Sequence, residues 1–114
     1  MQPKTAKLLD DIRDAAAFIR EAVRDRTIDD YHGDRLLRQA IERNFEIIGE
    51  AMKRLGRHDP ASVARIGDYR QIIAFRNILI YGYDLVDHRL VWSTIEEQVP
   101  ALLSDVAALL GSDD

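Results

Sequence analysis

The sequence predicts an all-α protein, most simply an up-and-down four-helix bundle with a short extra helix between the second and third long helices. Two observations support this prediction. Apolar residues recur at spacings of three and four over four long segments, and no stretch keeps the two-residue alternation that is typical of a strand. A chain of 114 residues is also the size of one ordinary domain, so we expect a single domain over residues 1–114.

The first two long helices are predicted from their apolar faces and from the residues between them. The first covers residues 3–24, and a polar gap at 29–33 follows, with aspartates suited to capping the next helix. The second covers residues 34–55 and ends before Gly56, which suits a left-handed helix cap. The stripe of the first helix consists of Leu8, Leu9, Ile12, Ala16, Ile19 and Val23, and that of the second of Leu37, Ile41, Ile48, Ala51 and Leu55.

Two prolines help to predict the helices in the second half of the chain. Asp59 followed by Pro60 is typical of a capping residue with proline at the first helical position, and it predicts a short helix over residues 60–66. The last long helix is expected over residues 88–110 and contains Pro100. Because proline has no backbone N–H, we expect this helix to lose one hydrogen bond and to kink at Pro100.

The third long helix, over residues 69–81, is apolar almost all round, so we expect it to be buried on more than one face, with a second subunit as the second cover. Arg76 lies in its main apolar stripe, with Tyr83 seven residues further on. Asn77 and Tyr81, four residues apart, adjoin that stripe. An unpaired buried charge is very costly, so Arg76 needs a partner.

Two interpretations of Arg76 follow from its chemistry. It forms a structural ion pair with a carboxylate of the second helix, such as Glu46 or Glu50, or it contributes to an anion site where its guanidinium and tyrosine hydroxyls bind a phosphate. Arg43, Glu46 and Glu50 lie opposite the core stripe of the second helix and serve either interpretation.

Composition excludes several classes of function. The chain has no cysteine, which excludes disulfides and thiolate metal sites, and its three histidines have no spacing typical of metal ligands, so we expect neither metal nor cofactor. It has no run of about 18 apolar residues and no apolar N-terminal signal, so we expect a cytoplasmic protein without a membrane span. The net charge of −4 argues against a surface that is basic all over, but it allows a local basic cleft.

Two segments together resemble one known family. Residues 75–83, Phe-Arg-Asn-Ile-Leu-Ile-Tyr-Gly-Tyr, resemble the signature of HepT-like HEPN proteins, which is Arg, four residues, His, any residue, Tyr. Residues 40–51, Ala-Ile-Glu-Arg-Asn-Phe-Glu-Ile-Ile-Gly-Glu-Ala, are similar to the second helix of that family. The helix order also agrees over nearly the whole chain.

The resemblance implies a four-helix HEPN bundle that forms a homodimer and brings two copies of the motif into one cleft. It implies the toxin half of a toxin–antitoxin module, a metal-independent ribonuclease that acts on RNA. The antitoxin implied is an MntA-like nucleotidyltransferase that adds AMP to the motif tyrosine, which is Tyr83 here. By the same resemblance, Arg76 holds the scissile phosphate, Asn77 orients it, and Tyr83 also contacts RNA in the cleft.

One position departs from the family signature, because Tyr81 stands where the family has histidine. An imidazole with a pKa near 6.5 suits proton transfer at neutral pH, whereas a phenol with a pKa near 10 does not. Three explanations fit: a naturally weakened homologue, an inactivated variant, or a tyrosine that does the work. We expect attenuation.

Two other functions remain open from the sequence. The first is a non-enzymatic HEPN module that binds and regulates a nucleotidyltransferase. The second is a helical bundle that binds RNA or a nucleotide without toxicity. Only the enzyme is expected to cleave RNA when the histidine is restored at position 81.

Overall fold

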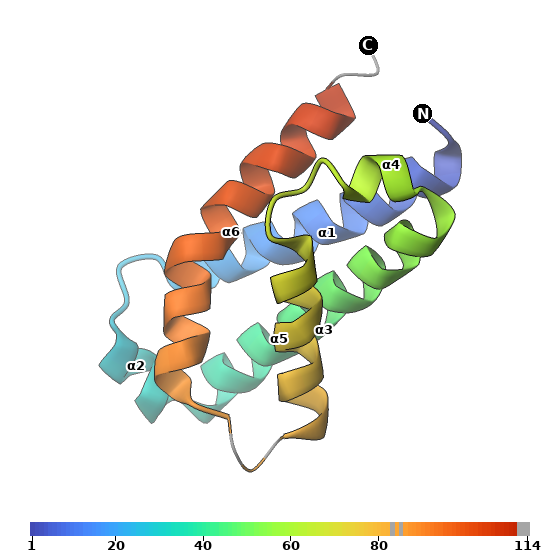
Figure 1. Cartoon of the computed structure of the whole chain (residues 1–114). Helices are drawn as coiled ribbons and strands as arrows, with labels where there is room; N and C mark the ends of the chain where they lie inside the picture. Colours follow the sequence, from blue (N-terminus) through green and yellow to red (C-terminus); the bar gives the residue numbers. More distant parts are fainter. Residues whose placement is uncertain (83, 85, 112–114) are drawn as a thin grey trace.

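A computed structural model describes residues 1–82, 84 and 86–111, and every regular element in these ranges is a helix (Figure 1). This confirms the all-α prediction. The long helices are α1 (Pro3–Ala22), α3 (Arg35–His58), α5 (Tyr69–Tyr81) and α6 (His88–Gly111), and the short ones are α2 (Ile28–Gly33) and α4 (Pro60–Val63).

Helix α3 is the centre of the arrangement. Helix α1 packs along it, α6 packs against α1, and α5 packs on α3 from another side (Figure 1). The core lies where the apolar stripes of these helices meet, and its fully buried side chains include Leu9, Ile12, Ile41, Ile48, Val91 and Val106. Helix α5 therefore depends on α3 for its position within one chain.

The short helix α2 lies where the sequence predicted a polar gap over residues 29–33, so that prediction was wrong. A capping box forms it: the Thr27 hydroxyl accepts from the Asp30 backbone N–H at 3.2 Å, and the Asp30 carboxylate accepts from the Thr27 N–H at 2.9 Å. A helix of six residues is too short to show an apolar period. It places Tyr31 in the core, against the rings of His88 and Trp92.

Helix α3 continues past Gly56, so its predicted end at residue 55 was also wrong. Gly56 has no positive φ, and the helix ends at His58, because Asp59 precedes a proline and is disfavoured in helical geometry. Asp59 then caps α4, with Pro60 at the first helical position as predicted. Helix α4 ends at Val63, earlier than the predicted residue 66.

The last two long helices agree closely with their predicted ranges. Helix α5 has the predicted bounds, and α6 extends one residue beyond its predicted end. Pro100 lies inside α6, which changes direction about its middle (Figure 1). Among the described residues, no helix is long and apolar enough to cross a membrane.

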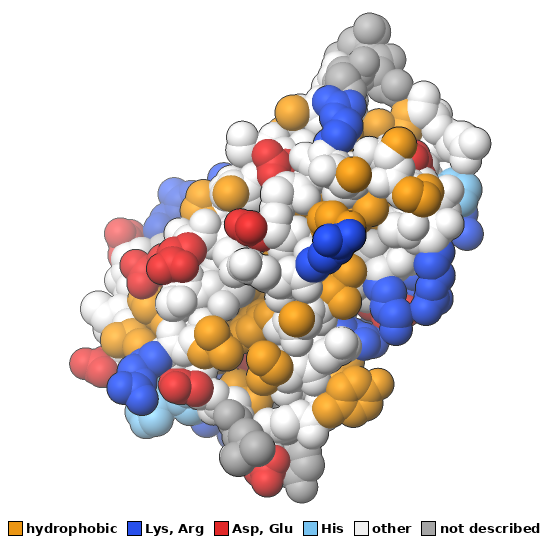
Figure 2. All heavy atoms as spheres, viewed as in Figure 1, with side chains coloured by type: hydrophobic (Ala, Val, Ile, Leu, Met, Phe, Trp, Pro, Cys, Tyr) orange, Lys and Arg blue, Asp and Glu red, His pale blue; other side chains and the backbone are white. Residues whose placement is uncertain are grey.

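Helix α5 leaves one face uncovered. It buries Ile72, Phe75 and Leu79, whereas Ile78 is 43% exposed and Tyr81 is 77% exposed. Figure 2 shows hydrophobic side chains gathered over α5 and the neighbouring part of α6. We predicted that this helix is buried on more than one face. Within one chain it is not, because α5 packs chiefly against α3.

Candidate functional site

Helices α3 and α5 make a close backbone approach where Gly49 faces Arg76. A Cβ atom on Gly49 would lie 2.3 Å from the Cβ and 2.5 Å from the Cγ of Arg76, so only glycine fits at this point. Four residues earlier on α3, the ring of Phe45 packs edge-to-face on Phe75 with their centroids 5.0 Å apart. These contacts fix where the Arg76 side chain leaves α5.

The Arg76 guanidinium is held by two partners. Its Nη2 donates to Glu50 Oε2 at 2.9 Å, and its Nη1 donates to Asn77 Oδ1 at 3.0 Å. Only 15% of the Arg76 side chain is exposed, and its Nε is buried with no hydrogen-bond partner among the described residues. Of the two interpretations of Arg76, the ion pair with a carboxylate of the second long helix is present in the single chain, with Glu50 and not Glu46 as the partner.

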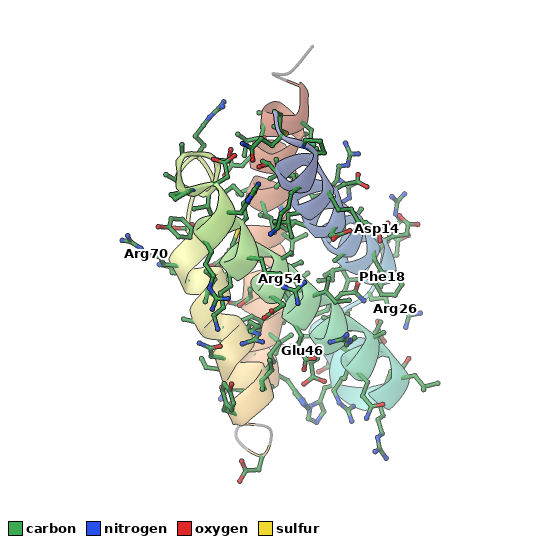
Figure 3. The ribbon with its side chains drawn as sticks, turned by 90° about the vertical axis from the view of Figure 1, so that its right-hand side faces the viewer. Asp14, Phe18, Arg26, Glu46, Arg54 and Arg70 are labelled. Atoms are coloured by element: carbon green, nitrogen blue, oxygen red, sulfur yellow. The ribbon has the colours of Figure 1, made fainter. Side chains whose placement is uncertain are left out.

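The polar band of α3 surrounds this pair. Glu50 Oε1 also accepts from Arg54 Nε at 3.1 Å, and one turn earlier Arg43 Nη1 lies 3.3 Å from Glu46 Oε2. Figure 3 shows Glu46 and Arg54 projecting from α3 on the same face. With Arg76 these residues line a depression of about 220 Å³, called the Arg76 depression below, whose apolar wall includes Leu8, Ile47 and Ile80.

The structure does not bring Tyr81 to this depression. Tyr81 follows Arg76 by five residues, so at about 100° per residue the two side chains leave α5 roughly 140° apart. Asn77 lies between them, exposed on the same face as Tyr81 while it contacts Arg76. Tyr83, the remaining predicted site residue, lies outside the described residues. Within one chain, Arg76 is thus joined to Glu50 and Asn77 but not to Tyr81.

Sequence reasoning missed a histidine pair and the role of Gly49. His32 in α2 and His88 at the start of α6 lie with their Nδ1 atoms 2.6 Å apart. They are 56 residues apart in the chain, and the helix that carries His32 was not predicted, so no local signal indicated this contact. In the described ranges, no group of three or more His, Cys, Asp or Glu side chains is placed to hold a metal ion.

The surroundings of His88 make folding sensitive to acid. Burial, then the charges of His32 and Arg38, lowers the pKa of His88 below its usual value of 6.5, although Asp87 acts in the opposite direction. The unfolded chain binds the His88 proton more readily than the folded chain, so this stability is present above pH 6.5 and is lost as the pH falls below it.

We therefore expect the urea midpoint to drop between pH 7.5 and 5.5, and the drop to shrink in His88→Gln. An equal pH dependence in the wild type and His88→Gln would contradict this account of His88.

The fold and this geometry define a class of protein. It is a helical bundle in which the third long helix carries an arginine, fixed on a glycine and a glutamate of the second, followed by Asn77 and Tyr81 on an uncovered face.

A family model described as "Ribonuclease HepT-like" matches residues 12–109. The chain belongs to the HepT-like ribonuclease family.

Individual relatives agree with the family match. The chain is 31% identical over 102 residues to a protein named "Putative RNase" from Caldanaerobacter subterraneus subsp. tengcongensis, covering 90% of each chain. It is 34% identical over 97 residues to "Probable ribonuclease HepT" of Thermococcus cleftensis, covering 82% of this chain and 84% of the relative. No solved structure matches the chain.

Proposed function

We propose that this chain is the toxin subunit of a toxin–antitoxin module, an RNA-cleaving enzyme that needs no metal ion and is attenuated by Tyr81. The observation that carries the proposal is the placement of Arg76. A largely buried guanidinium in a small depression with polar and apolar walls, in a chain of a ribonuclease family, is suited to binding a phosphate of RNA.

The active unit is a homodimer formed through α5. Its uncovered face contains Ala74, Ile78 and Tyr81, which are small or apolar side chains suited to packing against a second copy. Arg76 and Tyr81 leave α5 in different directions. A second copy of the chain, related by a two-fold axis, would bring both groups to one RNA strand. The dimer would thus complete a site that one chain leaves open.

The proposed chemistry is a transesterification within RNA. The ribose 2′-hydroxyl attacks the adjacent phosphorus, the new 2′-O–P bond forms, and the P–O5′ bond breaks to leave a cyclic phosphate and a 5′-hydroxyl. Arg76 stabilises the negative charge that develops on the phosphoryl oxygens, and Asn77 holds the guanidinium in place. The group at position 81 takes the proton of the 2′-hydroxyl or gives one to O5′.

The test is RNA cleavage in the presence of EDTA. At high enzyme concentration, the wild type should produce slow cleavage with 5′-hydroxyl ends, and Arg76→Ala should abolish it. Cleavage that survives Arg76→Ala, or that stops when EDTA is added, would refute the proposed site.

The proposed antitoxin is a small MntA-like nucleotidyltransferase encoded beside this chain, with Tyr83 as the AMP acceptor. Co-expression with the neighbouring gene should add AMP masses to the intact protein, and Tyr83→Phe should remove them. Tyr69→Phe, seven residues before Arg76 on α5, is a matched control that should keep the modification. Unmodified wild-type protein after co-expression would contradict this role of Tyr83.

One observation favours a second candidate function. The ion pair between Glu50 and Arg76 occupies the guanidinium, as a purely structural role requires. The rival is a non-enzymatic HEPN module that binds and regulates the nucleotidyltransferase. It predicts a stable complex with that partner and no RNA cleavage, even from Tyr81→His.

A further inference from the structure

We infer that Glu50 is a carboxylate latch, which occupies Arg76 in the RNA-free protein and must be displaced before Arg76 can bind a phosphate. This inference rests on the proposed function and concerns the regulation of the same site. It begins from the geometry of Glu50, whose two oxygens are used by two different arginines, Oε2 by Arg76 and Oε1 by Arg54.

The latch depends on the contact below it. Because the Arg76 stem rests on Gly49, the guanidinium reaches the next residue of α3, which is Glu50. Arg76 is held in this position at 15% exposure, whereas the Glu50 side chain is 39% exposed. Glu50 is therefore the partner with more freedom to move into solvent.

Arg54 can keep the displaced Glu50 carboxylate in an ion pair. It lies one turn further along α3, 63% exposed, and it already donates to Glu50 through Nε. When Glu50 leaves Arg76, it can keep this contact and its charge stays paired. The exchange replaces one charge-assisted hydrogen bond of Arg76, to a carboxylate, with another, to a phosphate.

The neighbouring carboxylate has a different partner. Glu46 lies one turn earlier on the same face of α3, and its contact is with Arg43 at 3.3 Å. It carries the same charge into the same depression, where its ion pair is with Arg43 and that of Arg76 is with Glu50. Glu46 thus provides a matched control for the general effect of removing a negative charge near bound RNA.

The experiment measures binding of a short fluorescein-labelled single-stranded RNA by anisotropy at low salt. Glutamine in Glu50→Gln keeps an acceptor for Arg76 but lacks the charge, so it competes with the phosphate for the guanidinium less strongly than glutamate does. We therefore expect RNA affinity to rise on the order of tenfold. Glu46→Gln should raise it less, and the effect of Glu50→Gln should vanish when combined with Arg76→Ala. Glu50→Ala serves if Glu50→Gln does not fold.

The outcomes separate the latch from the proposed function. If Arg76→Ala weakens RNA binding but Glu50→Gln also weakens it, or only equals Glu46→Gln, the latch is overturned and the RNA site stands. If Arg76→Ala changes RNA binding in neither the wild-type nor the Glu50→Gln background, the RNA site itself is overturned, and the latch with it.

Discussion

Tyr81→His is expected to raise the rate of RNA cleavage by about 10²–10⁴-fold at neutral pH, the usual contribution of general acid–base catalysis. Within one chain Tyr81 is 77% exposed, so the substitution replaces few intrachain packing contacts and should leave the stability of the single chain nearly unchanged. The imidazole titrates near neutral pH, whereas a phenol does not. Single-turnover cleavage of one RNA by both proteins measures the change.

The pH profile provides the control for this gain. With histidine at position 81, the rate should change with a pKa near that of an imidazole, and Tyr81→Phe should show neither the gain nor that pKa. A Tyr81→His rate equal to that of the wild type would mean that position 81 does not transfer protons in this protein.

Gly49→Ala is expected to destabilise the fold by about 1–3 kcal/mol, the usual cost of overpacking. The added Cβ would lie 2.3 Å from Arg76 Cβ, an atom fixed to the α5 backbone, so α5 must shift as a unit. Thermal unfolding should show the midpoint lower by roughly 4 °C or more. In the Tyr81→His background, the same shift should reduce cleavage because it moves Arg76 out of its position in the Arg76 depression.

Gly56→Ala, in the same helix, is the matched control and should have the opposite sign. Its Cβ would lie 3.8 Å from Val63 Cγ1, which is ordinary contact, and alanine is favoured over glycine inside a helix by roughly 0.5–1 kcal/mol. If both variants lower the midpoint equally, the close approach at Gly49 does not limit the packing of α5.

The long helices could be predicted from the sequence because each has an apolar stripe with a helical period. The predicted bounds of α5 were correct. The structure also has Pro60 at the first position of α4 and Pro100 inside α6, as predicted. The errors occurred where one local signal competes with another. Gly56 suggested a helix end, but the Asp59–Pro60 pair ends α3, and α2 was missed because six residues cannot show a period.

The candidate site was predictable only in part. The buried charge of Arg76 required a partner, which the sequence left open as a carboxylate or a bound phosphate. Two carboxylates lie on one face of α3, but the choice of Glu50 depends on the crossing of α3 and α5 at Gly49. The contact of His32 with His88 depends on how α2 meets α6, which no spacing encodes. Such contacts arise from tertiary packing, so the spacing of residues along the sequence does not predict them.

The most direct test of an RNA-cleaving site at Arg76 compares Tyr81→His with the double variant Tyr81→His/Arg76→Ala on one RNA in EDTA. We expect rapid cleavage by the first and a loss of at least about 10²-fold in the second, the cost typical of removing a donor that stabilises transition-state charge. Equal rates from the two proteins, or no cleavage by Tyr81→His, would contradict it.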